Sequence, residues 1–134
     1  MKKIWIVSCM VLLFAFVGLL SCASVKPITQ ADLADLKGKW KGFYQDQSGY
    51  YRQPVELEIL DEQLLGKFTW GHANRPATTT PPYNGKLENG RIIYSWPSSQ
   101  VNLNFSKGKT VMKLEGDYKI GQYPPGTISL EKVK

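Results

Sequence analysis

Hydrophobic residues occupy every second position in several stretches of the chain beyond residue 38. Val, Leu and Ile alternate with Glu over residues 55–59, and Val, Leu and Phe alternate with Asn and Ser over residues 101–106. A third stretch of this kind covers residues 92–96. Because successive side chains of a β-strand point to opposite faces, the pattern predicts strands with one buried face.

Turn-forming residues separate these stretches at short intervals. The pattern predicts eight strands, near residues 38–45, 50–60, 63–71, 83–88, 91–96, 100–106, 110–120 and 126–133. A short helix over about residues 30–36 precedes them, with Thr29 as its N-cap and Asp32 as the acid at the third helical position. One helix followed by many short strands indicates an all-β fold, a small antiparallel meander barrel; a flattened sandwich is the alternative.

Two local signals fix details of this arrangement. Asn89 and Gly90 both tolerate positive φ, so they predict a type I′ hairpin in which Glu88 and Arg91 face each other across the strands. Pro54 has no N–H to donate to a ladder, so its strand is expected to start there, to bulge, or to lie at an edge.

The parity of the strands also predicts which side chains point inward. The inward set is Trp40, Tyr44, Val55, Leu57, Ile59, Leu64, Phe68, Trp70, Leu87, Ile92, Tyr94, Trp96, Val101, Leu103, Phe105, Met112, Leu114, Tyr118, Ile128 and Leu130. An eight-stranded barrel is just wide enough for side chains to fill or for one small ligand. So many large aromatics favour a mostly filled barrel with a shallow pocket at one mouth over a deep acyl-chain cavity. Gly42, Gly66 and Gly85 face inward and could leave space, and Gly66 could mark a bulge or a close approach.

The first residues of the chain are typical of a secretory signal. Lys2 and Lys3 precede an uncharged apolar run over residues 4–20, which is the layout of a segment that enters a bilayer while its positive end stays behind. The run is at the short limit for a membrane-spanning helix, so a retained transmembrane anchor is the alternative.

The sequence Leu19-Leu20-Ser21-Cys22 closes this run and resembles the lipobox of bacterial lipoproteins. The resemblance implies that residues 1–21 are removed as a lipoprotein signal peptide. Cys22 would then carry a diacylglyceryl thioether and an N-acyl chain of the palmitate type, which anchor the protein to a membrane. Residues 22–28 would form a lipidated tether and residues 29–134 the barrel domain. Ala23 follows the cysteine, so in a Gram-negative host the resemblance implies the outer membrane, facing the periplasm.

A second resemblance begins where the short helix meets the first predicted strand. Leu36-Lys37-Gly38-Lys39-Trp40, with its Gly-x-Trp, is similar to the start of calycin-type barrels, which include lipocalins, fatty-acid-binding proteins and avidins. Leu65-Gly66-Lys67-Phe68 is similar to avidin-like sequences. The resemblance implies a lipocalin-like barrel whose closed end is plugged by Trp40. In the family a late arginine covers this tryptophan, and the present chain has no arginine after Arg91.

Composition excludes several kinds of chemistry. The 134 residues contain one histidine and two cysteines, too few for a disulfide framework, a Cys-rich zinc site or most histidine-based catalysis. The Gly-x-Ser-x-Gly elbow of serine hydrolases does not occur, and Glu56 and Glu58 share a face that parity places in solvent. We therefore expect no enzyme activity, no metal and no cofactor.

Charge gives a weaker indication. Without Lys2 and Lys3 the 17 basic residues become 15 against 11 acidic ones, a formal balance of +4. The sequence has no Lys/Arg run of the kind that binds nucleic acid, so no nucleic-acid partner is expected.

The long connection over residues 72–82 is rich in Thr and Pro and holds the candidate site. Loops of this length are often functional. We predict that His72 and Arg75 form a polar clamp at the barrel mouth, with Trp70, Tyr83 and Trp96 as an aromatic stacking wall. The alternative is that these residues only satisfy backbone groups of the loop.

Together these features predict a lipid-anchored cell-envelope protein. Its barrel would bind a small ligand (a lipid, a glycan or another envelope molecule) without catalysis. The alternative is a structural or interaction lipoprotein, an envelope assembly factor or inhibitor, with a filled barrel and a protein partner.

Overall fold

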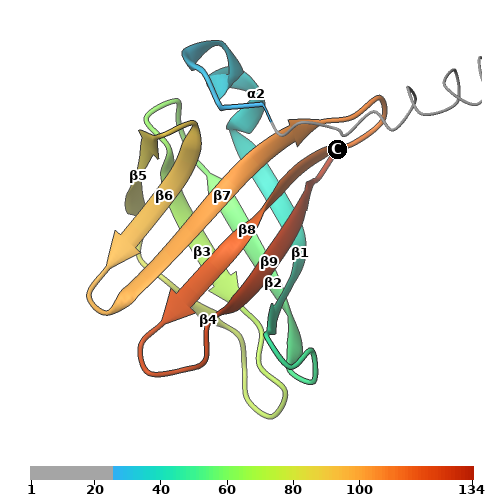
Figure 1. Ribbon diagram of the computed structural model, residues 1–134, viewed down its shortest axis with the longest axis vertical. Coiled ribbons are helices and arrows are strands. Elements are labelled where there is room, and N and C mark those ends of the chain that lie inside the picture. Colours follow the sequence, from blue (N-terminus) through green and yellow to red (C-terminus); the bar gives the residue numbers. More distant parts are fainter. Residues whose placement is uncertain (1–25) are drawn as a thin grey trace, which may run out of the picture.

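The protein is a closed eight-stranded antiparallel β-barrel with one short helical segment (Figure 1). The structure, a computed structural model, describes residues 26–134. The predicted signal peptide and Cys22 lie outside these residues. The barrel strands are β1 (Gly38–Asp46), β2 (Arg52–Ile59), β3 (Leu65–Trp70), β5 (Tyr83–Glu88), β6 (Arg91–Trp96), β7 (Ser99–Lys107), β8 (Met112–Ile120) and β9 (Gly126–Lys132).

The barrel follows a meander. Successive strands pair antiparallel, β9 returns to pair with β1, and the β2–β3 pairing closes the ring. The predicted meander barrel is therefore confirmed, and the alternative sandwich is wrong. The ladders are uneven: β7 and β8 pair over nine residues, whereas β3 and β5 pair only at Leu65–Asn84 and Gly66–Tyr83.

A short additional strand pairs with the end of β3 that β5 does not reach. This strand, β4 (Thr78–Thr79), lies within the predicted loop and pairs with Thr69 and Trp70 of β3. The backbone N–H of Thr80 donates to the Phe68 carbonyl at 2.8 Å. The chain then passes through residues 81–82, both prolines, before β5 begins. The missing proline N–H groups divide what would otherwise be one strand into two.

Pro54 lies inside a strand. The strand β2 begins at Arg52, two residues before the proline, and the β1–β2 register continues through the Phe43–Pro54 pair without a bulge. On the other side of β2 the ladder with β3 starts at Val55. Pro54 is therefore one residue beyond that ladder, where its carbonyl accepts the N–H of Gly71 at 2.8 Å.

The hairpin between β5 and β6 has the predicted turn. Asn89 and Gly90 have φ values of 50° and 72°, as a type I′ turn requires. Glu88 lies opposite Arg91 in the register, as expected. The ion pair of Arg91, however, is with Asp117 on β8, at 3.3 Å.

The core agrees closely with the predicted inward set. Seventeen of the twenty residues are buried, and Leu87, Trp96 and Met112 are partly buried. The core also includes Ile28 and Leu36. Ile28, which the sequence placed in the tether, is 4% exposed and donates its N–H to the Gly90 carbonyl at 2.9 Å. The packed domain therefore begins by residue 28, ahead of the predicted boundary.

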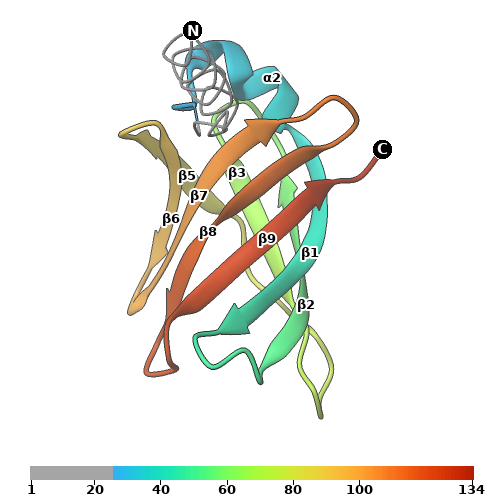
Figure 2. The same cartoon turned by 45° about the vertical axis from the view of Figure 1, so that its right-hand side comes forward.

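One end of the barrel is closed by the helical segment η2 (Gln30–Asp32) and α2 (Leu33–Leu36), seen at the top of Figures 1 and 2. The Asp32 carboxylate accepts both the backbone N–H and the hydroxyl of Thr29, at 2.8 and 3.1 Å. This is the predicted helix start. Below the helix the Trp40 indole is fully buried and donates to the Leu36 carbonyl at 2.8 Å.

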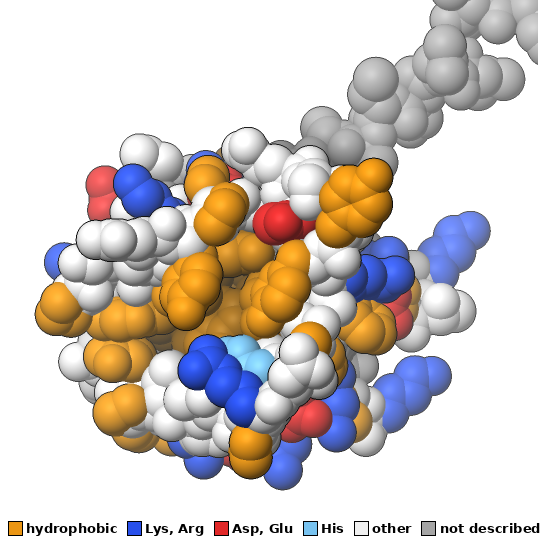
Figure 3. All heavy atoms as spheres, turned by 90° about the horizontal axis from the view of Figure 1, so that it is seen from below, with side chains coloured by type: hydrophobic (Ala, Val, Ile, Leu, Met, Phe, Trp, Pro, Cys, Tyr) orange, Lys and Arg blue, Asp and Glu red, His pale blue; other side chains and the backbone are white. Residues whose placement is uncertain are grey.

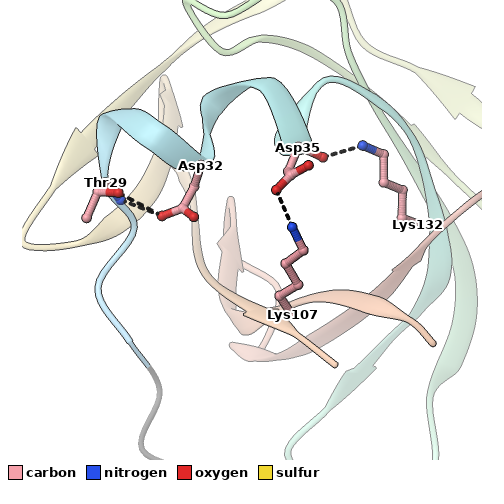
Figure 4. A network of polar contacts seen from close by, with 5 residues as sticks. All are labelled: Thr29, Asp32, Asp35, Lys107 and Lys132. Carbon is pink, nitrogen blue, oxygen red and sulfur yellow. Dashed lines mark hydrogen bonds and ion pairs between the residues drawn. The ribbon is translucent and has the colours of Figure 1, made fainter. Parts of the chain in front are cut away.

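Two lysines attach the helix to the strands (Figure 4). Lys107 donates to the Asp35 carboxylate at 2.9 Å, and this hydrogen bond lowers the pKa of Asp35. Lys132 donates to the backbone carbonyl of Asp35, and its ammonium lies 5.6 Å from the centre of the Trp40 ring. The side chain that covers this tryptophan is thus a lysine from β9.

Candidate ligand pocket

A cavity of about 560 Å³ opens at the end of the barrel opposite the helix. Figure 3 looks into this end and shows hydrophobic side chains around a hollow, with histidine and basic side chains along one side. The residues that line the cavity are Tyr44, Asp46, Tyr51, Trp70, His72, Arg75, Thr78, Thr80, Trp96, Tyr118, Ile120, Tyr123 and Pro124.

Aromatic rings in contact with one another separate the cavity from the filled half of the barrel. Phe68, fully buried, stacks under Trp70 at 5.4 Å with an interplanar angle of 14°. Tyr44 meets Trp70 edge-on at 5.0 Å and Tyr118 at 5.5 Å. These are the geometries that aromatic pairs prefer. The barrel is filled on the helix side of this layer and hollow on the other side, which corresponds to the shallow pocket that the sequence favoured.

Four of the five predicted site residues line this cavity: Trp70, His72, Arg75 and Trp96. Tyr83 does not. Its register with Gly66 places it further from the mouth, and its ring stacks on Trp96 at 5.1 Å and 14°. Tyr83 therefore supports the Trp96 ring, which itself lines the cavity.

His72 and Arg75 are in contact, as the predicted clamp requires. A guanidinium nitrogen of Arg75 lies 3.5 Å from His72 Nδ1, and His72 Nε2 lies 3.0 Å from the Thr78 hydroxyl oxygen. Because a guanidinium only donates hydrogen bonds, Nδ1 is the acceptor and Nε2 carries the proton. Partial burial and then the positive charge of Arg75 lower the pKa of His72, which favours this neutral form.

The buried tyrosines of the wall are held as neutral phenols. Tyr44 donates its hydroxyl to the Gly71 carbonyl at 2.7 Å, and the Tyr51 hydroxyl lies 3.4 Å away. Burial, followed by the contact with Tyr51, raises the pKa of Tyr44. Burial is also the main cause that raises the pKa of Tyr118. Neither group is suited to act as a base near neutral pH.

Asp46 is the one acidic residue of the lining, and its carboxylate is used within its own loop. It accepts the hydroxyl of Ser48 at 2.7 Å and the backbone N–H of Tyr51 at 3.4 Å. The Ser48 hydrogen bond is the main cause that lowers the pKa of Asp46. Asp46 therefore stays ionised at neutral pH and, through Oδ1, orders the loop that follows β1.

The sequence did not identify the other nine residues of the lining. Tyr44 and Tyr118 were predicted to point inward, but strand parity does not tell which inward side chains lie at the mouth. Asp46, Tyr51 and Tyr123 come from the ends and loops of the β1–β2 and β8–β9 connections. The alternation of inward and outward side chains holds only within a strand, so no pattern in the sequence assigns these residues to the site.

Fold and site together define a closed antiparallel barrel with an aromatic pocket at its open end. Among residues 26–134, no three His, Cys, Asp or Glu side chains are grouped so that they could hold a metal ion. In the same part of the chain no helix has the length and hydrophobicity needed to cross a bilayer. In comparisons with known proteins the chain matches no family model, no curated protein and no solved structure.

Proposed function

We propose that this chain is a lipid-anchored cell-envelope protein whose barrel binds a small ligand in the pocket at its open end, without a covalent step. The observation that carries this proposal is the aromatic cavity of about 560 Å³. Small-molecule sites measure about 300–1,000 Å³ and combine apolar walls with a few placed polar groups. The present cavity falls within this range of volumes, and it also combines aromatic walls with a few polar groups.

The lining supports recognition without catalysis. The buried phenols stay protonated, Asp46 is used within its turn, and His72 is neutral and bonded on both ring nitrogens. What the cavity offers a ligand is planar aromatic surface together with hydrogen-bond donors at the rim. Such a surface accepts the ring face of a sugar or the apolar body of a lipid, the ligand classes expected from the sequence. The Gly-x-Trp resemblance to ligand-binding calycins supports the same class.

The envelope location is supported by the signal-like residues 1–21 and by the lipobox at Cys22. The described chain begins at the closed end, where Ile28 donates its N–H to Gly90 in the β5–β6 turn just before the helical segment. An anchor at Cys22 would therefore leave the pocket open to the periplasm or the outer medium. Mass spectrometry of the mature N-terminus tests this part of the proposal. A triacylated Cys22 supports it, and an intact Met1 or an unmodified Cys22 thiol contradicts it.

Tryptophan fluorescence tests ligand binding, because Trp70 and Trp96 line the cavity whereas Trp40 lies at the opposite end. All core residues fall between Ile28 and Leu130, so a soluble chain starting at residue 22 with Cys22→Ser contains the complete barrel. Envelope lipids and glycan fragments are titrated against this chain. We expect a saturable emission change that is reduced in Trp70→Phe and in Trp96→Phe. No response across the panel, or a response that persists in Trp70→Phe/Trp96→Phe, contradicts ligand binding in this pocket.

A protein partner is the second candidate, and exposed rim tyrosines favour it. Tyr50 is 96% exposed and Tyr123 is 67% exposed, both in loops at the open end. Tyrosine is enriched at protein interfaces. Photo-crosslinking from Tyr123 in intact cells tests this candidate. A single specific adduct supports it, and the absence of any adduct contradicts it.

A further inference from the structure

We infer that the pocket selects ligands that join a planar apolar body to one anionic group, and that Arg75 is the receptor of the anion. This inference rests on the proposed small-ligand function and narrows its ligand class. The charges and the aromatic rings around the cavity support it.

Arg75 has no carboxylate partner within residues 26–134. The described chain contains five ion pairs, and Arg75 belongs to none of them. The other two arginines are occupied: Arg91 pairs with Asp117, and the Arg52 guanidinium lies 4.2 Å from the centre of the Phe43 ring. The one polar side-chain contact of Arg75 in this part of the chain is the 3.5 Å approach to His72 Nδ1. A guanidinium has five N–H donors, so most of those of Arg75 are left for a ligand.

Asp46 is the one lining group of opposite charge, and it does not pair with Arg75. Asp46 is engaged by Ser48 and by the backbone of its own turn. His72 is neutral, and its Nδ1 lone pair holds the Arg75 guanidinium beside the cavity. The charge acts within the pocket: burial and Tyr51 raise the pKa of Tyr44, and Arg75 opposes them. The cavity lining thus carries one guanidinium with free N–H donors, Arg75, and one carboxylate, Asp46, that forms no ion pair with it.

Two aromatic rings held in place at the cavity define the surface for the body of the ligand. Trp96 is partly buried and is backed by the parallel ring of Tyr83 at 5.1 Å, so its position is fixed. Trp70 is held in the same way by Phe68. These fixed rings favour a flat apolar group, and the low-dielectric wall strengthens a hydrogen bond from Arg75 to an anion at the rim. A carboxylate, sulfonate or phosphate can accept two parallel N–H bonds from a guanidinium, which adds geometric selectivity.

Two fluorescent probes separate the parts of this inference. N-phenyl-1-naphthylamine is neutral, and 8-anilinonaphthalene-1-sulfonate is the same aromatic body with a sulfonate added. Both become fluorescent in apolar sites, and both are titrated against the soluble Cys22→Ser chain and its Arg75→Gln variant. We expect Arg75→Gln to weaken binding of the sulfonate about tenfold and to change the dissociation constant of the neutral probe less than twofold. Arg75→Lys, which keeps the charge but loses the planar fork, is expected to recover part of the loss.

Arg52→Gln is the matched control, since it removes a guanidinium from the outer surface next to Phe43. It should leave both dissociation constants unchanged, and near-UV circular dichroism checks that every variant is folded. Equal weakening of both probes by Arg75→Gln overturns the inference, because Arg75 then acts on the shape of the pocket. Unchanged sulfonate binding overturns it as well. If neither probe binds, or if both bind unchanged in Trp70→Phe/Trp96→Phe, the proposed function itself fails and the inference fails with it.

Discussion

Two buried tyrosines, Tyr44 and Tyr94, differ in what their hydroxyl groups contact. The Tyr44 hydroxyl donates to the Gly71 carbonyl at 2.7 Å, whereas the buried Tyr94 hydroxyl has no hydrogen-bond partner within the described residues. The Tyr94 ring is confined by two glycines: a Cβ at Gly66 would lie 2.6 Å from its hydroxyl, and one at Gly85 would lie 3.0 Å from its ring. The close approach expected at Gly66 is thus a contact with this ring.

This difference predicts opposite effects of the same substitution. Tyr94→Phe removes an unpaired polar group and should raise the free energy of unfolding by about 1 kcal/mol. Tyr44→Phe leaves the Gly71 carbonyl without its donor and should lower it by about 1 kcal/mol. Urea denaturation measures both changes in the free energy of unfolding, provided that the m-value stays the same. A destabilised Tyr94→Phe would mean that its hydroxyl does have a partner, such as a buried water.

The pairing of His72 with Arg75 predicts a pKa change. Burial and the neighbouring guanidinium both disfavour the charged imidazolium, so the pKa of His72 lies below its ordinary value. Arg75→Gln removes the like charge and leaves the burial, so it should raise the pKa of His72. An NMR titration of the single histidine gives this value directly. A pKa that stays the same or falls in Arg75→Gln would show that the two side chains are not neighbours in solution.

The residue scale also shows how far a sequence can identify the site. Trp70 and Trp96 could be assigned because their strands have a clear period of two, and His72 and Arg75 because they lie in one long loop directly after such a strand. Tyr83, predicted as part of the stacking wall, lies behind Trp96 and does not itself line the cavity. Its distance from the mouth depends on the β3–β5 register, which only two residue pairs define. Register between strands separated by a long loop is not encoded in either strand alone.

At the scale of elements, the helix at the closed end depends on β9. Lys132 is the last residue of β9, and it pairs directly with Trp40 in the β1–β9 ladder. Its ammonium therefore reaches both the indole face and the Asp35 carbonyl at the end of α2. A cation over an aromatic ring contributes about 0.5–1 kcal/mol at an accessible site, and a cation near a helix C-terminus is favourable as well.

Substitutions of Lys132 can distinguish the contribution of its ammonium charge to stability from the contribution of its apolar stem. Lys132→Met keeps the apolar stem and loses the ammonium, and we expect the free energy of unfolding to fall by about 1 kcal/mol. For a domain of this size that loss lowers Tm by roughly 4 °C. Lys132→Arg should retain most of the stability, because a guanidinium also donates and also stacks on indole. Lys134→Met is the control, since Lys134 is exposed beyond the strand. Equal losses in both methionine variants would contradict the role of Lys132.

The elements that the sequence predicted well are those with strong local signals. Alternating stretches located the eight barrel strands, and Asn89 and Gly90 located the β5–β6 turn because few residues accept positive φ at both positions. The strand β4 was missed, since two threonines in a proline-rich segment carry no period of their own. The covering of Trp40 by Lys132 was missed too, because it requires β9 to return to β1, a contact between opposite ends of the domain.

At the scale of the whole molecule, the ring closure gives the barrel two unlike ends. The helical segment, the start of the described chain and the C-terminus lie at the filled end, as Figures 1 and 2 show. The connections β1–β2, β3–β4, β6–β7 and β8–β9 lie at the open end, and three of them contribute to the pocket lining. The packed core and the pocket therefore lie towards opposite ends, so changes in the open-end loops should alter the pocket with little effect on the core.

This polarity predicts how the protein stands on a membrane. From Cys22 to Ile28 there are six residue steps, which span at most about 21 Å, so an acylated Cys22 would hold the filled end near the bilayer. The pocket would then face away from it, separated by the length of the barrel strands. In chains carrying a single added thiol, Lys109→Cys marks the β7–β8 turn at the filled end and Gln122→Cys marks the β8–β9 loop at the open end.

A fluorophore on each thiol of the lipidated chain, reconstituted into vesicles that contain brominated phospholipid, measures the orientation. We expect quenching at position 109 and little at position 122, because bromine quenches only at short range. The same labels on the soluble Cys22→Ser chain should show no quenching at either position. Equal quenching at 109 and 122 in the lipidated chain would mean that the barrel lies on its side. Stronger quenching at 122 would mean that the pocket faces the membrane and draws its ligand from the lipid itself.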